Sequence, residues 1–158
     1  MSDEQSIRFI LPRGATGFFR PQDGPLPKTD RRAFRTALHA AARAAGGAVR
    51  EVEERTYPRT YHVATVVGRT GEWTVLCHAH HPWIAFADGP HDMGVSGFRV
   101  PPDWAGAISG AGFTVLGADL LTAPLSQVNT SVLTGGEWRE IRFYGIATLG
   151  EVLFNAWD

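Results

Sequence analysis

An alanine-rich amphipathic stretch, followed at once by a change to two-residue alternation, sets the framework of this chain. Residues 30–45 predict a helix that Thr29 or Asp30 can cap and that Gly46-Gly47 ends. Apolar side chains recur along it at the spacing of one helix face: Phe34, Leu38, Ala41, Ala42 and Ala45. Much of this face is alanine, which suits close packing on a sheet, and the chain beyond it alternates as strands do.

Short apolar runs bounded by glycine, proline and turn residues predict strands along much of the remaining chain. Arg69-Thr70-Gly71-Glu72 and Thr134-Gly135-Gly136-Glu137 are typical of hairpin turns between neighbouring runs. The predicted strands cover residues 7–11, 48–54, 61–67, 73–80, 83–87, 98–100, 113–116, 128–133 and 138–144.

Two further helices are predicted in the second half of the chain. Pro101-Pro102-Asp103 opens one, and Thr148-Leu149-Gly150-Glu151 fits a capping box ahead of a short C-terminal helix. Helices do not alternate regularly with strands, so the order indicates an α+β fold, a mostly antiparallel sheet of hairpins with about three helices packed on it.

The length indicates one domain over residues 1–158. Residues 1–6 are expected to be disordered, because they are short, polar and acidic. Residues 12–29 are rich in glycine and proline and predict a loop. Whether this loop is a lid, an arm or a fixed part of the fold stays open at this point.

Composition excludes several classes of protein. With 44% hydrophobic and 20% charged residues, the chain can bury a core and is not a wholly disordered or coiled-coil sequence. No apolar run reaches the roughly 18 residues that a membrane-spanning helix needs. The polar start does not resemble a secretory signal, and Cys77 is the only cysteine, so we expect a cytoplasmic protein without disulfides.

Charge is almost balanced overall but unevenly distributed along the chain. The formal net charge is −1, which argues against a nucleic-acid partner, because phosphate neutralisation needs a cationic excess. Residues 1–60 hold 11 basic and 7 acidic residues, whereas residues 61–158 hold 4 and 9. An acidic second part suits a basic protein partner and can steer its approach.

The run Cys77-His78-Ala79-His80-His81-Pro82 is the sharpest chemical feature. On a strand, His78 and His80 would lie on one face and could bind zinc or another transition metal, with His91 and Asp92 completing the site. Such a site would make the protein a metal-dependent enzyme or a metal-binding protein. The simpler interpretation is a set of polar histidines on a half-exposed strand.

Two other uses of this region are open. Trp73 and Trp83 flank the histidines and are either core residues or the floor of a small-ligand pocket. Cys77 could act as a nucleophile with His62 as its base, although a free cysteine in an apolar strand is more often buried. No serine-elbow or phosphate-loop motif is present.

The C-terminal stretch Thr148-Leu149-Gly150-Glu151-Val152-Leu153-Phe154-Asn155-Ala156-Trp157-Asp158 resembles the ending of small bacterial proteins of the toxin-immunity type. The resemblance covers this tail and the general layout. It implies a compact α+β protein that binds and blocks a cognate toxin domain stoichiometrically, without catalysis and without a cofactor.

An inhibitor of this kind needs an interface, and the acidic second part of the chain suggests its residues. We expect the binding surface to face a basic toxin and to include Asp88, Asp92, Asp103, Asp119 and Trp83. The expected partner is a cognate toxin or another protein, with neither nucleic acid nor membrane involved.

Overall fold

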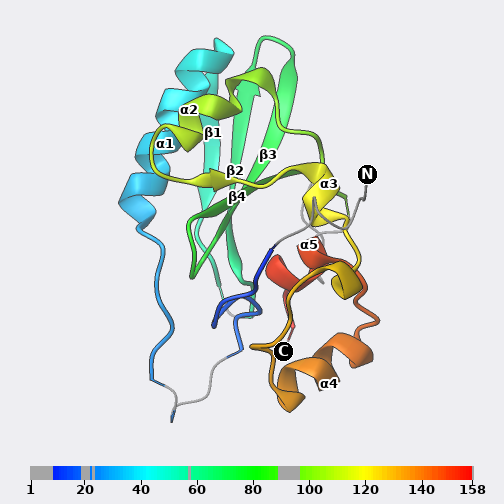
Figure 1. Ribbon diagram of the computed structural model, residues 1–158. Helices are drawn as coiled ribbons and strands as arrows, with labels where there is room; N and C mark the ends of the chain where they lie inside the picture. The colour runs from blue at the N-terminus through cyan, green and yellow to red at the C-terminus, as the bar shows by residue number, and fades with distance from the viewer. Residues whose placement is uncertain (1–8, 19–21, 23, 57, 89–96, 158) are drawn as a thin grey trace.

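The computed structural model describes residues 9–18, 22, 24–56, 58–88 and 97–157 (Figure 1). Residues 1–6, which were expected to be disordered, lie outside the described residues. The helices and strands in chain order are α1 (Arg31–Ala45), β1 (Ala48–Glu53), β2 (Tyr61–Gly68), β3 (Gly71–His78), β4 (Trp83–Ala87), η3 (Asp103–Ala105), α2 (Gly106–Ser109), β5 (Thr114–Val115), α3 (Ala118–Leu121), η4 (Leu125–Gln127), α4 (Gly135–Phe143) and α5 (Leu149–Leu153).

The strands form one sheet in the order β1-β2-β3-β4-β5, which is the order of the sequence. The first three pairings are antiparallel, and β5 pairs with β4 in parallel. This parallel pairing follows from the connection between β4 and β5, which carries η3 and α2 across one face of the sheet (Figure 1). The predicted α+β class with a mostly antiparallel sheet is confirmed.

The amphipathic helix forms where the sequence places it. The Asp30 side chain accepts hydrogen bonds from the backbone N–H groups of Arg32 and Ala33, so Asp30 is the cap. Gly46 ends α1 with a φ of 74°, a left-handed conformation that favours glycine. At Gly47 the backbone of β2 passes so close that a Cβ would lie 1.7 Å from the Val67 carbonyl oxygen.

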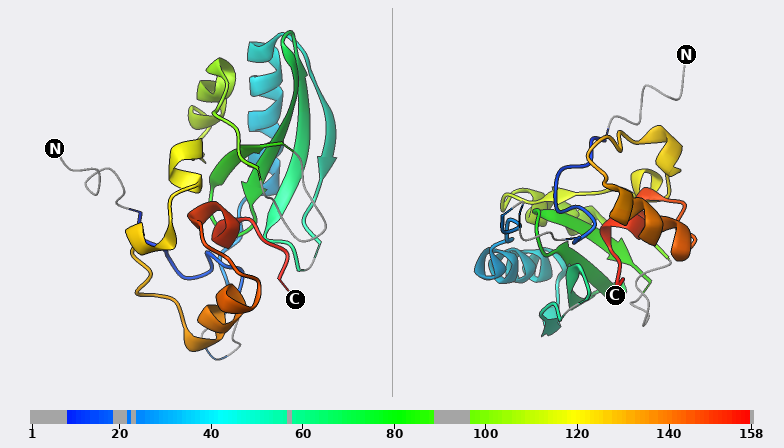
Figure 2. Two further views of the ribbon diagram at one scale, coloured as in Figure 1. Left: turned by 90° about the vertical axis from the view of Figure 1, so that its right-hand side faces the viewer. Right: turned by 90° about the horizontal axis from the view of Figure 1, so that it is seen from below.

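Two hydrophobic cores form, one on each face of the sheet. Phe34 and Leu38 of α1 pack with Ile108 of α2 and Phe86 of β4 on one face. On the other face, the N-terminal segment and the elements from α3 to the C-terminus cover Tyr61, Leu76 and Trp83, among others. Figure 2 shows α1 on one side of the sheet and α4 and α5 on the other. The sheet is therefore buried on both faces for part of its length.

The predicted hairpin over residues 128–144 is wrong. Residues 135–143 are helix α4, and Thr134 is its cap rather than part of a hairpin turn. The Thr134 side chain accepts from the backbone N–H of Glu137, while the Glu137 carboxylate accepts from the backbone N–H of Thr134, which is a capping box. The two glycines thus lie in the first turn of a helix.

Other predicted elements are shorter than expected or absent. In place of strand 7–11, the described residues from Phe9 onward form an irregular segment with one bridge, from Ile10 to Asn129. Residues 98–100 also form a single bridge, at Phe98, and residues 113–116 shorten to the two residues of β5. The part of the chain described here holds five α-helices rather than about three.

Candidate functional site

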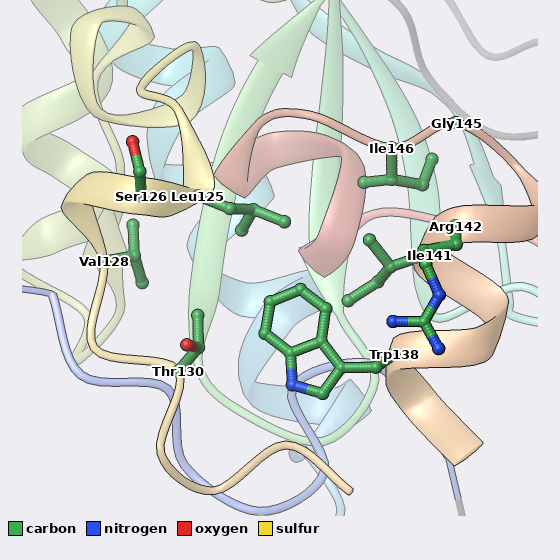
Figure 3. A pocket seen from close by; sticks show the side chains of 9 residues that line it. All are labelled: Leu125, Ser126, Val128, Thr130, Trp138, Ile141, Arg142, Gly145 and Ile146. Atoms are coloured by element: carbon green, nitrogen blue, oxygen red, sulfur yellow. The ribbon is translucent and has the colours of Figure 1, made fainter. Parts of the chain in front are cut away.

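A cleft of about 620 Å³ opens beside α4, between this helix and the chain that runs through η4. Figure 3 shows Leu125 of η4 on one side and Trp138, Ile141 and Ile146, from α4 and the residues after it, on the other, with their side chains pointing toward one another. The lining residues are Leu125, Ser126, Val128, Thr130, Trp138, Ile141, Arg142, Gly145 and Ile146. The volume is within the usual range for small-ligand sites.

The helix side of the cleft is oriented by a buried carboxylate. Glu137 is only 7% exposed, and besides the capping box it accepts a hydrogen bond from the Thr16 hydroxyl of the N-terminal segment. These bonds fix the first turn of α4, the helix on which Trp138 and Ile141 line the cleft. Arg142 lies beside them at its rim (Figure 3).

The opposite side of the cleft is held by backbone hydrogen bonds rather than by a regular element. The Leu125 N–H donates to the Ala147 carbonyl at 3.0 Å, joining the start of η4 to the chain ahead of α5. The Asn129 N–H donates to the Phe9 carbonyl at 2.9 Å, and its own carbonyl accepts from Leu11 at 3.1 Å. The cleft is thus preformed, with an ordered backbone on both sides.

The lining of the cleft is apolar with hydrogen-bond donors and no carboxylate. No aspartate or glutamate is among its lining residues. Arg142 has no acidic partner within ion-pair distance among the described residues, and the Trp138 indole N–H has no hydrogen-bond acceptor there. The hydroxyls of Ser126 and Thr130 add two more polar groups.

Large apolar side chains are exposed around the same part of the molecule. Phe143 of α4 is 78% exposed, and Val132, in the loop before α4, is 39% exposed. Ile10 bridges to Asn129 next to the cleft lining, and the Phe18 ring lies against Gly136 of α4. Neither Phe143 nor Val132 is among the residues that line the cleft.

The histidine run is held inside the fold. His78 is fully buried, and its Nδ1 accepts from the backbone N–H groups of His80 and His81 at 3.1 and 3.2 Å. Its Nε2 therefore carries the proton and donates to the Ala15 carbonyl at 2.9 Å. Both ring nitrogens of His78 are engaged, which leaves neither free for a metal ion in this conformation.

The neighbouring histidines bind the same N-terminal segment. His80 Nδ1 donates to the Pro27 carbonyl and His81 Nε2 to the Arg13 carbonyl, each at 2.8 Å. Burial lowers the pKa of His78 to about 3 and also lowers that of His80, with nearby cationic side chains acting in the same direction. These hydrogen bonds join the described part of loop 12–29 to the end of β3 and the residues that follow it.

The predicted metal site needs His91 and Asp92 as ligands beside His78 and His80. Both His91 and Asp92 lie outside the described residues. Within the ranges that the structure describes, no three histidine, cysteine, aspartate or glutamate side chains gather as a metal-ion site.

Of the predicted acidic interface residues, Asp92 lies outside the described residues, and the other three lie on or next to different elements. Asp88 is exposed directly after β4, and Asp103 is exposed at the start of η3, which packs with α1. Asp119 is exposed on α3, which packs with α5 on the opposite face of the sheet. Trp83 is 9% exposed and packs in the core, its ring stacked on His81 at 4.6 Å.

Cys77 of β3 lies opposite His62 of β2 in the antiparallel pairing. The surroundings of the two side chains disfavour their use as a nucleophile and its base. Cys77 is fully buried, and burial raises the pKa of its thiol to about 12. His62 Nδ1 accepts from the Arg55 backbone N–H at 2.8 Å, and burial lowers the pKa of this imidazole to about 4. A thiolate nucleophile is disfavoured at this position.

A second, polar groove of about 440 Å³ lies on the uncovered part of the sheet at β1, β2 and β3. Glu51 and Glu53 of the edge strand β1 line it together with Thr65 and Thr74. The Glu53 carboxylate pairs with Arg59 at 2.8 Å, so part of this negative charge is neutralised within the chain.

Comparison with protein families, with curated proteins and with solved structures found no match to this chain. No helix in the described ranges is both long and apolar enough to cross a bilayer. The assignment of a site therefore depends on its geometry alone.

The cleft is not predicted by the sequence pattern. That pattern indicates a strand over residues 138–144, on which residues 138, 141 and 142 do not share one face. The signal that could have found the cleft is the Thr134–Glu137 capping box, because on a helix these three residues lie side by side.

Proposed function

We propose that this protein is a non-catalytic binding protein, an immunity-like inhibitor that neutralises a cognate toxin domain through a protein–protein interface centred on the cleft beside α4. The observation that carries the proposal is an apolar cleft whose two sides are joined to the rest of the fold by backbone and capping hydrogen bonds. In this arrangement an apolar side chain of the partner enters the cleft.

The composition of the cleft supports a protein partner. Binding energy at protein interfaces is concentrated in a few residues, with tryptophan and arginine enriched, around a desolvated pocket. Trp138 and Arg142 line the cleft, and Ile141 and Ile146 form its apolar wall. The expected interface involves α4 rather than Asp88, Asp103 and Asp119, none of which lines the cleft.

The test fills the cleft without touching the core. Ser126 lines the cleft and is exposed, so Ser126→Trp places a bulky ring in it. Ser109 is exposed on α2, on the other side of the sheet, so Ser109→Trp is the matched control. The full-length chain with an affinity tag is expressed in its native host in three forms: wild type, Ser126→Trp and Ser109→Trp.

We expect one protein to co-purify in stoichiometric amount with the wild type and with Ser109→Trp, and to be lost with Ser126→Trp. That protein, expressed alone, should arrest growth, and co-expression with wild type but not with Ser126→Trp should restore it. Recovery of no partner by any form, or equal recovery by Ser126→Trp, contradicts the proposal, as does a partner without toxicity.

A further inference from the structure

We propose that the cleft selects a carboxylate group carried on an apolar body; this inference rests on the proposed function and names the chemistry of the group that enters. The occupant is the C-terminal carboxylate of the partner protein, carried on an apolar last residue. Tighter binding of a free acid that lacks the peptide group would contradict this choice. A neutral group of the same shape would bind more weakly.

The first argument is the unpaired positive charge. Arg142 stands at the rim of a cleft whose lining holds no acidic residue, and among the described side chains no carboxylate pairs with it. Ion pairs among the described residues occupy other arginines, as Arg31 pairs with Glu54 at 2.6 Å, and leave the Arg142 guanidinium available to a ligand. A guanidinium offers planar, paired N–H donors that match a carboxylate.

The second argument is the position of the charge relative to the apolar wall. Figure 3 shows the Arg142 guanidinium next to the Trp138 indole, with Ile141 and Ile146 adjoining. A ligand that pairs its carboxylate with Arg142 can therefore lay an apolar body on Trp138 and the isoleucines. The charged part of such a ligand would meet a cation, and its apolar part would meet apolar side chains.

The third argument is the set of neutral donors around the cleft. The indole N–H of Trp138 can only donate, and it points toward the side on which Thr130 lies (Figure 3). The hydroxyls of Thr130 and Ser126 can also donate to a carboxylate oxygen. An anionic acceptor gains more from such donors than a neutral one, since charge-assisted hydrogen bonds are stronger.

The experiment compares matched probes on the full-length chain by NMR titration of its backbone amides. N-acetyl-L-phenylalanine carries the carboxylate, and N-acetyl-L-phenylalaninamide has the same shape without the charge. The acid 3-phenylpropanoate lacks the peptide group, so its affinity relative to N-acetyl-L-phenylalanine distinguishes a free acid from a chain end. We expect shifts at Trp138 and its neighbours, with a Kd for the carboxylates on the order of tenfold lower than for the amide.

Arg142→Gln should remove the difference between carboxylate and amide while Arg139→Gln keeps it. Arg139 is exposed on the same helix and does not line the cleft, so it controls for net charge. Equal affinity for acid and amide overturns this inference but leaves the proposed function standing, since an apolar anchor would still fit. Absence of any binding near Trp138 also overturns this inference. The proposed function fails by a different result, which is that Ser126→Trp still retains the partner protein.

Discussion

His78 joins two parts of the chain with the two nitrogens of one ring. Nδ1 closes the turn after β3 by accepting from His80 and His81, and Nε2 holds Ala15 of the N-terminal segment. Protonation of Nδ1 would place an N–H against two N–H donors, so the neutral tautomer is a condition of this local structure. At the scale of single residues, His78 therefore has a structural role.

We expect the free energy of unfolding to fall as the pH is lowered from about 7 to 5. Burial lowers the pKa of His62 to about 4 and of His78 to about 3 from the ordinary value of 6.5. The unfolded chain takes up protons on these histidines near pH 6.5 and the folded chain does not, so acid favours unfolding. The loss approaches about 1.4 kcal/mol per pH unit for each histidine well below pH 6.5.

Urea unfolding at several pH values measures this slope. His39 is exposed on α1, so His39→Gln should leave the slope unchanged, whereas His78→Asn should reduce it whatever its effect on absolute stability. An unfolding free energy that stays constant between pH 7 and 5 would contradict the assignment of neutral buried imidazoles.

At the scale of elements, α4 and α5 both begin with a capping box, but the two boxes differ in their burial and in their further contacts. Thr134 and Glu137 cap α4, and Thr148 and Glu151 cap α5, with both side-chain-to-backbone bonds present in each box. Glu151 is partly exposed, whereas Glu137 is buried and also binds Thr16. The sequence predicts the second box, whereas the glycines of the first favour a hairpin turn as well as a helix start, so its pattern alone is ambiguous.

Glu137→Ala should destabilise the protein more than Glu151→Ala does. Loss of a capping box costs about 1 kcal/mol, and the buried Thr16 hydroxyl left without its acceptor costs about 1–3 kcal/mol more. Urea unfolding of the two variants measures the difference. Equal destabilisation would show that the bond between Glu137 and Thr16 contributes little.

At the scale of the whole molecule, the N-terminal segment and the C-terminal tail are joined through the end of the sheet. The Asn155 side chain donates to the carbonyls of Thr16 and Val152 at 3.1 and 2.7 Å and accepts from the Trp157 N–H at 3.2 Å. The Asn155 backbone exchanges hydrogen bonds with Thr60, next to β2. Asn155 is 2% exposed, so these bonds have no water to replace them.

Asn155→Ala should lower the free energy of unfolding by about 2–4 kcal/mol, because it leaves the buried Trp157 N–H and the Thr16 carbonyl without partners. Asn129 is the matched control, since its side chain accepts one bond from the Ser131 N–H at the surface. Asn129→Ala should cost less than about 1 kcal/mol by the same urea measurement. A similar cost at both positions would contradict the central role given to Asn155.

Local patterns determined helix α1 with its Asp30 cap, the hairpin of β2 and β3, and the capped C-terminal helix, because each depends on residues within a few positions of one another. Only the tertiary structure decided whether Thr134-Gly135-Gly136-Glu137 caps a helix, where the histidine nitrogens bind and which side chains line the cleft. Those outcomes depend on contacts between residues far apart, such as Thr16 and Glu137, which are 121 positions apart in the chain. Hydrophobic spacing within one segment carries no information about such partners.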